Sequence, residues 1–283
     1  MAHDKTTNRR QYLTALGAGS AAALAGCLGG GDGDGNGDGG GDDETETVTI
    51  GSDIPYAPFE YRNEAGELIG FDVEIAEAVF AGELGLDYEF QETSFDGIIA
   101  SLNNANFRVI MSAMTINETR AERVDFSDPY FTAYQTVLVL DGGGITELDD
   151  LRGESVGVQR GTTGEGAAEE LQADFDGDLE IQSYDQITGA FDALLNNQVS
   201  AVINDNTVSE SFAADNEEVV FLEGDGAAAD RDDAPEYLTL TIEEYGIAFR
   251  QDDDEFREEV NEALAAIRED GTYDDIYDEY FGV

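Results

Sequence analysis

Arg120 is the residue whose type and position most directly indicate chemistry. It stands on the first turn of a helix expected to start at Asn117, shortly after an apolar strand expected over residues 109–111. A guanidinium beside unpaired N–H groups suits a small carboxylate, because its planar fork can bind both oxygens at once. The alternative is an exposed arginine paired with Glu118 or Asp125, and the residue types alone do not decide between the two.

Three other polar side chains follow expected strands. Asp53 and Tyr56 come after a strand expected over residues 48–51, in a loop that two prolines hold extended. Asp205 ends the strand expected over residues 199–205. Open α/β sheets bind ligands at the carboxyl ends of their strands, so these residues are candidates for a binding site. Core packing of Tyr56 and simple helix capping by Asp205 are the alternatives.

Residues 159–165 place a glycine and two threonines, Thr162 and Thr163, before an expected helix. Backbone N–H groups and hydroxyls in such a turn favour an anion. Phosphate is the competing ligand, but the segment lacks the lysine and the full glycine spacing of a phosphate-binding loop. We therefore reject a phosphate site.

The run Ala113-Met114-Thr115 with Arg120, closed by Val124-Asp125-Phe126-Ser127-Asp128-Pro129-Tyr130, resembles the signature of family 3 extracellular solute-binding proteins. These are the amino-acid receptors of ABC importers. The sequence GFDVEIAEAV over residues 70–79 and the Gly-Thr-Thr turn at residues 161–163 extend the resemblance, which covers about residues 46–283.

The resemblance implies a ligand contact at ten positions: Asp53, Tyr56, Phe95, Ala113, Met114, Thr115, Arg120, Thr162, Thr163 and Asp205. Arg120, with the threonines and the main chain near it, would hold the ligand carboxylate. Asp205 would receive the α-ammonium group. Tyr56 and Phe95 would enclose the ligand side chain, and Asp53 would contact its polar end. Phe95 could equally be an ordinary core residue.

The fold implied by the resemblance is α/β, with two lobes of the type II periplasmic-binding-protein kind. Two strands, near residues 135 and 245, would form the hinge. Residues 47–134 and 246–283 are expected to form the first lobe, and residues 135–245 the second. Because both lobes would contact the ligand, binding would favour the closed form.

Two further segments are expected to affect local structure. Ala105 stands where the family usually has glycine, and Arg108 replaces an acidic residue, so a local turn or helix cap is expected to be disturbed. Residues 252–254 are three aspartates and are expected to form a solvated turn.

Acidic residues dominate the composition. Asp and Glu number 64 against 13 Lys and Arg, a formal charge of −51, and Lys5 is the only lysine. With 41% hydrophobic residues the chain can still form a folded core, and the lack of a basic patch excludes nucleic acid as a partner. The composition favours a halophilic protein, of archaeal type, over an acidic protein from a low-salt habitat.

The N-terminal residues are expected to direct export. Residues 1–26 resemble a twin-arginine signal, with Arg9 and Arg10 before an apolar segment too short for a permanent membrane helix. Cys27 follows in a sequence that resembles a lipobox, so we expect a lipid anchor there and no disulfide. Residues 27–46, rich in glycine and aspartate, are expected to be a flexible linker and not a calcium loop.

The resemblance thus implies a monomeric lipoprotein receptor on the extracellular face of the cell membrane. It would bind a free amino acid, with a polar or basic side chain favoured by Asp53, and deliver it to an ABC transporter permease. No enzyme activity, cofactor or metal is expected. One alternative is a cleft enzyme of the dehydratase kind, with Asp53 or Glu60 as the acid or base. Another is a ligand sensor, although no transmembrane segment or signalling domain is expected after residue 27.

Overall fold

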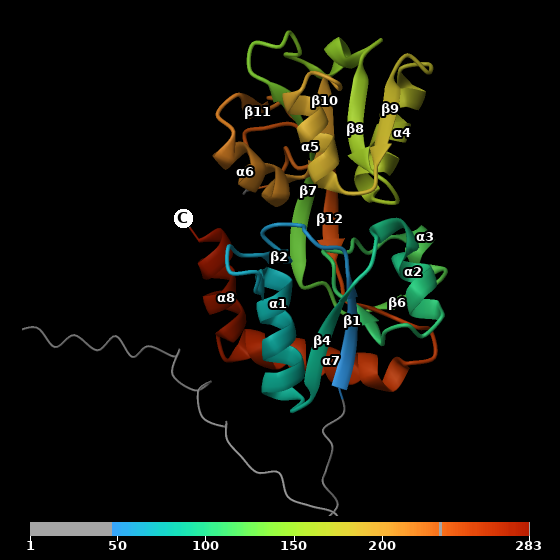
Figure 1. Ribbon diagram of the computed structural model, residues 1–283, viewed down its shortest axis with the longest axis vertical. Helices are drawn as coiled ribbons and strands as arrows, with labels where there is room; N and C mark the ends of the chain where they lie inside the picture. The colour runs from blue at the N-terminus through green and yellow to red at the C-terminus, as the bar shows by residue number, and fades with distance from the viewer. Residues whose placement is uncertain (1–46, 232–233, 283) are drawn as a thin grey trace, which may run out of the picture. The chain divides into compact units, whose positions relative to one another are not determined.

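The computed structural model describes residues 47–231 and 234–282, which contain two large β-sheets and a small two-stranded one (Figure 1). The expected export signal, Cys27 and the expected linker lie outside the described residues. In the described part of the chain, no helix is long and apolar enough to cross a membrane.

The strands of the first large sheet are β1 (Thr47–Ser52), β4 (Asp87–Glu92), β5 (Val109–Ile110), β6 (Asp125–Phe126) and β13 (Ala248–Phe249). They lie in the order β4-β1-β5-β13-β6. Strands β1, β4 and β5 are parallel, whereas β13 is antiparallel to both of its neighbours. A C-terminal strand therefore lies between strands from the first half of the sequence, and this sheet is built from two separate stretches of chain.

Helices surround this sheet, and we call the sheet with its helices the first lobe. They are α1 (Phe71–Ala76), the π-helix that continues it (Glu77–Glu83), α2 (Phe95–Asn103), α3 (Glu118–Ala121), α7 (Asp254–Glu269) and α8 (Thr272–Phe281). A hairpin of β2 (Tyr61–Arg62) and β3 (Leu68–Ile69) precedes α1.

The second large sheet comprises β7 (Phe131–Leu140), β8 (Ser155–Gln159), β9 (Glu180–Tyr184), β10 (Ala201–Asp205), β11 (Val219–Phe221) and β12 (Thr239–Tyr245). Its order is β11-β7-β10-β8-β9, and β12 pairs with β7 beside β11. The second lobe adds a 3-10 turn (Leu148–Leu151), α4 (Thr163–Asp174), α5 (Ile187–Leu195) and α6 (Asn206–Asp215).

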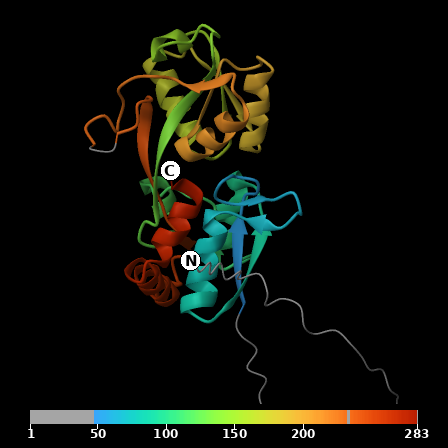
Figure 2. The same cartoon turned by 90° about the vertical axis from the view of Figure 1, so that its left-hand side faces the viewer.

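Strands β7 and β12 run antiparallel between the lobes, as both ribbon views show (Figures 1 and 2). Their pairing extends from Phe131 with Tyr245 to Thr136 with Thr239. Farther along β7, Val137 is fully buried, as expected for a strand covered on both faces. The prediction of two α/β lobes joined by a two-strand hinge is confirmed by this topology.

A cluster of aromatic rings anchors the hinge strands in the first lobe. The ring of Phe131, at the start of β7, lies 5.0 Å from that of Phe59 and 4.9 Å from that of Phe281. Tyr245, at the end of β12, lies 5.3 Å from Phe59. Edge-to-face and tilted pairs of this kind stabilise beyond the area that they bury. Bending of the hinge is therefore expected farther along the two strands, towards the second lobe.

The expected solvated turn at residues 252–254 is wrong for its middle residue. The carboxylate of Asp253 is 17% exposed and lies 3.2 Å from Nε of Arg108. The Arg108 guanidinium also lies 3.5 Å from the ring centre of Phe256. Arg108 thus has a local structural role between β5 and α7. Ala105 adopts a φ of 57°, a left-handed conformation that favours glycine.

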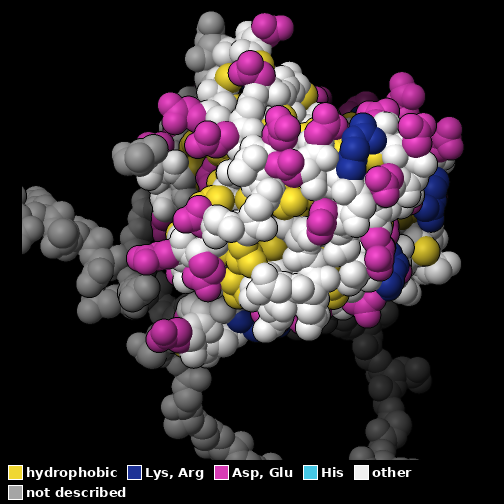
Figure 3. Space-filling view, turned by 90° about the horizontal axis from the view of Figure 1, so that it is seen from above, with side chains coloured by type: hydrophobic (Ala, Val, Ile, Leu, Met, Phe, Trp, Pro, Cys, Tyr) yellow, Lys and Arg dark blue, Asp and Glu magenta, His cyan; other side chains and the backbone are white. Residues whose placement is uncertain are grey.

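Acidic side chains are scattered over the face of the second lobe that Figure 3 shows, and few arginines lie among them. Repulsion between these carboxylates is weakened by salt, since the Debye length falls to about 3 Å at 1 M.

Candidate functional site

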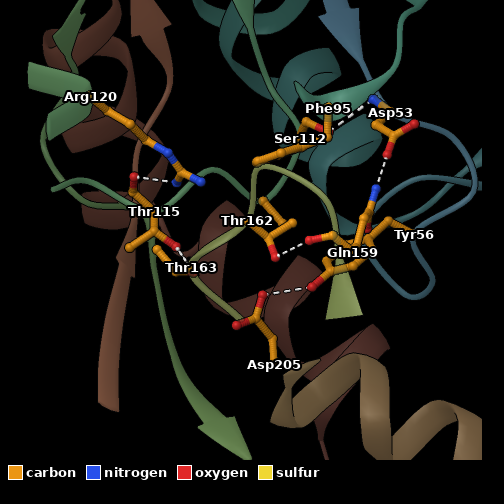
Figure 4. A pocket seen from close by; sticks show the side chains of 11 residues that line it. Asp53, Tyr56, Phe95, Ser112, Thr115, Arg120, Gln159, Thr162, Thr163 and Asp205 are labelled. Atoms are coloured by element: carbon orange, nitrogen blue, oxygen red, sulfur yellow. Dashed lines mark hydrogen bonds between the residues drawn. The ribbon is translucent and has the colours of Figure 1, made fainter. Parts of the chain in front are cut away.

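A small cavity lies between the two lobes (Figure 4). Its lining residues come from the loops after β1 and β5 and the starts of α2 and α3 in the first lobe, and from the ends of β8 and β10 and the start of α4 in the second. They are Asp53, Tyr56, Phe95, Ser112, Ala113, Thr115, Arg120, Gln159, Thr162, Thr163 and Asp205. A concave site with a few convergent polar groups is typical of small-molecule binding.

The structure brings together all but one of the ten residues that the sequence singled out. The exception is Met114, whose side chain is fully buried in a core cluster with Ile98 and Phe107. The main-chain carbonyl of Met114 accepts the N–H of Gly246, 3.0 Å away, which ties this loop to the segment after β12.

Arg120 is held by short-range contacts that the sequence encodes. The side chain of Asn117 accepts the N–H of Arg120 at 2.9 Å and so caps α3 as expected. The guanidinium donates to the carbonyl oxygens of Thr115, at 2.7 Å, and Gly161, at 3.3 Å. It also lies over the ring of Phe95, 5.2 Å from the ring centre. Because Gly161 belongs to the second lobe, Arg120 connects the two lobes.

The alternative of an exposed, ion-paired Arg120 is wrong. The residue is 7% exposed, and among the described residues no carboxylate lies within 4.0 Å of its guanidinium nitrogens. Burial lowers the pKa of Arg120, while the negative charges of Glu243 and Asp205 partly offset that effect. A buried cation is costly without an anionic partner, so this position favours an anionic ligand.

Asp205 faces the cavity from the end of β10. Its carboxylate accepts hydrogen bonds from the Tyr56 hydroxyl, at 2.6 Å, and from Nε2 of Gln135. Burial, and then the charge of Glu243, raise the pKa of Asp205 to about 6. Although Asp205 immediately precedes α6, its side chain makes no capping hydrogen bond. The alternative that it is a simple helix cap is therefore wrong.

Asp53 lies across the cavity from Gln159, whose amide donates to the Asp53 carboxylate. The backbone N–H of Asp53 donates to Oγ of Ser112 at 2.9 Å. Burial is the main cause that raises the pKa of Asp53 to about 6. Like the Tyr56–Asp205 bond, the Gln159–Asp53 bond joins the first lobe to the second. The structure is therefore a closed arrangement of the two lobes.

The Gly-Thr-Thr turn forms the start of α4. The Thr162 side chain caps this helix by accepting the N–H of Glu165 at 3.3 Å and donates to the carbonyl of Gln159 at 2.7 Å. The hydroxyl of Thr163 lies 3.3 Å from that of Thr115 in the other lobe. Hydroxyls and the N-terminus of a twelve-residue helix thus face the side of the cavity near Arg120.

Sequence reasoning missed several polar residues of the site: Ser112, Gln135, Gln159, Glu243 and Tyr245. Glu243 is the most informative of them, because it is only 4% exposed. On β12 it alternates with exposed Ile242 and Glu244, so it shares the inner face with buried Tyr245. No signal in the sequence indicates this, because apolar Leu240 and Ile242 alternate with Thr241 and Glu243, a pattern that predicts an outward-facing Glu243.

The described part of the site offers few residues that could support metal or acid–base chemistry. Over residues 47–231 and 234–282, no three His, Cys, Asp or Glu side chains are placed to hold a metal ion. Glu60, an acid considered for an enzyme, is fully buried and does not line the cavity, whereas Asp53 does.

Comparison with known proteins finds a matching family model and relatives of similar length. A model of the family described as bacterial extracellular solute-binding proteins, family 3, matches residues 48–283. The "Probable histidine-binding protein" of Neisseria gonorrhoeae is 31% identical over 276 residues, which are 97% of this chain and 96% of that protein.

Solved structures of amino-acid-binding proteins are also similar to this chain. An ancestral arginine-binding protein bound to arginine is 36% identical, with a TM-score of 0.74 over 83% of this chain and 98% of that chain. An ancestral amino acid-binding protein, described as a precursor of cyclohexadienyl dehydratase, is 35% identical, with a TM-score of 0.72 over 83% and 95% of the two chains. These likenesses confirm the predicted type II fold. Since the family model matches nearly the whole described part, the chain belongs to the family 3 extracellular solute-binding proteins.

Proposed function

We propose that this protein is an extracytoplasmic receptor that binds one free amino acid between its lobes and delivers it to an ABC importer. The observation that carries the proposal is the placement of Arg120, a buried cation with no protein carboxylate at ion-pairing distance, in the same cavity as the buried carboxylate of Asp205. Such a pair of opposite charges matches the carboxylate and ammonium groups of an amino acid.

The charges around the cavity support a cationic ligand side chain. Asp53 and Asp205 line it and Glu243 lies close enough to affect both Asp205 and Arg120, the single arginine of the lining. A ligand with two positive groups and one carboxylate balances these charges better than a neutral amino acid does. The similarity to a probable histidine-binding protein and to an ancestral arginine-binding protein supports the same ligand class.

Ligand contacts from both lobes would favour closure. The proposed carboxylate contacts come from Arg120 in the first lobe and Thr162 and Thr163 in the second. A ligand held by both binds the closed form more tightly, so it shifts the hinge equilibrium towards closure, and the importer would recognise that form. Closure also excludes solvent, which strengthens the charge contacts.

The remaining parts of the proposal concern the setting of this receptor. Residues 47–134 and 246–283 would move as the first lobe and residues 135–245 as the second. Twin-arginine export, a lipid on Cys27 and a linker over residues 27–46 would hold the monomer at the extracellular face of the membrane. The charge of −51 supports a halophilic habitat.

A panel of the common amino acids, tested by thermal shift in multimolar salt, would examine the function directly. Binding to the folded state raises the melting temperature by mass action, equivalent to about 2.7 kcal/mol at a hundredfold excess over Kd. The expected result is a clear rise with arginine, histidine or lysine and little change with acidic amino acids. A folded protein that responds to none of them would contradict the proposal.

Asp205→Asn is expected to weaken binding of amino acids much more than binding of analogues that lack the α-ammonium group. The amide keeps the size of the carboxylate but removes its charge, so the cost should be on the order of 2–5 kcal/mol for the natural ligand. Isothermal titration of both ligand kinds measures the difference. Equal losses for both would exclude the ammonium role.

Affinity for a cationic amino acid is expected to rise between about pH 5 and pH 7. The pKa of Asp53 and that of Asp205 are both raised to about 6, and a cation must displace the proton of each. The same shifts make the free energy of unfolding of the ligand-free protein fall as the pH rises from about 4 to 6, because the folded state then binds more protons than the unfolded state. Calorimetry at several pH values would test both signs. Affinity that does not change with pH would contradict the first sign, and a free energy of unfolding that does not fall as the pH rises from about 4 to 6 would contradict the second.

A dehydratase is the second candidate, favoured by the similarity to the ancestral precursor of cyclohexadienyl dehydratase and by Asp53, a cavity acid with a raised pKa. Mass spectrometry of the bound ligand separates the two functions. A receptor releases its ligand unchanged, whereas a dehydratase releases a product lighter by one water.

A further inference from the structure

Two acidic side chains, Glu60 and Asp72, are fully buried directly behind the wall of the cavity. Glu60 lies in the loop region after β1, and Asp72 lies on the first turn of α1. Neither lines the cavity, and the proposed binding role uses neither. Burying a carboxylate is costly unless it is neutralised or well bonded, so the pair requires a physical explanation.

Glu60 is connected to the cavity through Ser112. The Ser112 hydroxyl donates to Oε1 of Glu60 at 2.8 Å. The same hydroxyl oxygen accepts the backbone N–H of Asp53 at 2.9 Å. Because Ser112 and Asp53 both line the cavity, two hydrogen bonds connect Glu60 to the cavity wall.

Asp72 holds the adjacent part of the same wall. Its Oδ2 accepts the backbone N–H of Ala113 at 2.9 Å, and both of its oxygens lie within 2.9 Å of the Tyr130 hydroxyl. Ala113 has a φ of 47°, a left-handed conformation that a residue with a side chain adopts only when its surroundings impose it. The hydrogen bond to Asp72 supplies such a constraint one residue after Ser112.

The two carboxyl groups share one site with little to neutralise them. Glu60 Oε2 is buried and meets no N–H or O–H donor at hydrogen-bond distance among the described residues. The Ser52 hydroxyl lies close enough to lower the pKa of Glu60, but burial and the charge of Asp72 outweigh it. A protonated Glu60 would reduce the cost of burial, because its O–H could donate to the neighbouring Asp72 carboxylate. The groups that face the pair are the carboxylate of Asp53 and the hydroxyls of Ser52, Ser112, Tyr56 and Tyr130.

Titration directions agree with this arrangement. Burial and then the charge of Asp72 raise the pKa of Glu60 well above its usual value. Burial raises the pKa of Asp72 to about 6, while hydrogen bonds, including one with Glu60, lower it. The pair should therefore lose its two protons in separate steps, because the charge left by the first loss raises the pKa for the second.

We propose that one proton shared between Glu60 and Asp72 holds the cavity wall of Asp53, Ser112 and Ala113 in its ligand-binding geometry, and that loss of this proton weakens ligand binding. Glu60 and Asp72 are thus positioning residues that act through Ser112 and the backbone of Ala113. This inference rests on the proposed receptor function for its ligand readout, but the protonation itself does not.

The reason for the weakening is electrostatic. With the proton removed, two carboxylates would lie together in a buried site, with the Asp53 carboxylate close by. Such charges repel one another, so the loops that carry them should separate or admit water. Either change moves Asp53 and Ala113 away from the ligand. Together with the proton competition at Asp53 and Asp205, this predicts a bell-shaped dependence of affinity on pH.

Glu60→Gln is the variant that isolates the shared proton. A glutamine amide can donate to Asp72 and its oxygen can still accept from Ser112, so it imitates the protonated acid but cannot ionise. Glu64→Gln, in the exposed hairpin turn, is the matched control, since it removes the same charge away from the site. With arginine as the probe, the wild type and the control should lose about tenfold more affinity than Glu60→Gln does as the pH rises through the loss of the shared proton.

The decisive measurement needs no ligand. In the full exported chain labelled with carbon-13, the side-chain carboxyl resonance of Glu60, assigned through the backbone resonances of the same residue, should titrate at a clearly higher pH than an ordinary glutamate. Titration of this resonance in the ordinary range of a glutamate would overturn the proposal, and this outcome does not depend on the folding of the variant. Identical alkaline losses of affinity in Glu60→Gln and the wild type would also overturn it. If the Glu60 carboxyl titrates at a raised pH but no amino acid binds at any pH, the proposed receptor function is wrong and the shared proton is still supported.

Discussion

Arg120→Ala is expected to abolish measurable binding of amino acids. The guanidinium is buried, donates to the carbonyls of Thr115 and Gly161, and has no carboxylate of the described chain at ion-pairing distance. Removing it would leave the ligand carboxylate in a closed cavity without its main partner. Truncating one member of a buried charge pair costs about 2–5 kcal/mol, which is a loss of roughly 30-fold to several thousand-fold in affinity.

Arg123→Ala is the matched control for this prediction. Arg123 follows α3, is exposed, and lines a groove beside the cavity but not the cavity itself. At multimolar salt its charge should be screened, so affinity should change little. Titration calorimetry of both variants compares them directly. Unchanged affinity in Arg120→Ala, or equal losses in both variants, would remove Arg120 from the carboxylate site.

Gly161→Ala is expected to have the second largest effect, because it should prevent full closure of the lobes. Gly161 lies at the start of the Gly-Thr-Thr turn with a φ of 79°. A Cβ there would lie 2.9 Å from the Cα of Asp96, a backbone atom of the opposite lobe. Since backbone cannot rotate away as a side chain does, the lobes must separate. Affinity should then fall by about tenfold or more, because the ligand loses contacts from one lobe.

Gly177→Ala separates this effect from backbone strain. Gly177 has a φ of 88° in the same lobe, but a Cβ there would meet nothing within 4 Å. Both variants should therefore lose similar stability, about 1 kcal/mol, whereas only Gly161→Ala should lose affinity. Small-angle scattering with saturating ligand would show whether Gly161→Ala remains more open. Full closure and normal affinity in that variant would contradict the role of the close approach.

The second candidate function would respond differently to these variants. A dehydratase that uses Asp53 should lose turnover in Asp53→Asn while keeping much of its ligand affinity. A receptor in which Asp53 only contacts the ligand side chain should lose affinity, with no turnover to lose. The shared proton behind the wall affects Asp53 in either case, since Ser112 binds its backbone N–H.

The local parts of the site were determined by the sequence itself. The Asn117 cap places Arg120 on the first turn of α3, Asp205 ends a fully buried strand, and Thr162 caps α4. Caps, strand ends and turns depend on residues within a few positions of one another, so one stretch of sequence contains all the information that they need. The α/β class and its two lobes, in contrast, were implied by the resemblance to the family.

Only the tertiary structure decided which of these side chains are buried and what they meet. The Gln159–Asp53 bond spans 106 positions and the Tyr56–Asp205 bond spans 149, and both exist only because two separately built sheets close on each other. Burial also decided between the two interpretations of Arg120 and reversed the interpretation of Asp253. Arg120 is not an exposed ion pair, and Asp253 is not a free solvated acid. The chain has 64 acidic residues, and nothing in the sequence distinguishes a buried carboxylate from the many exposed ones. Burial is a property of the packed lobes, and it fixes the protonation and partners on which the chemistry of this site depends.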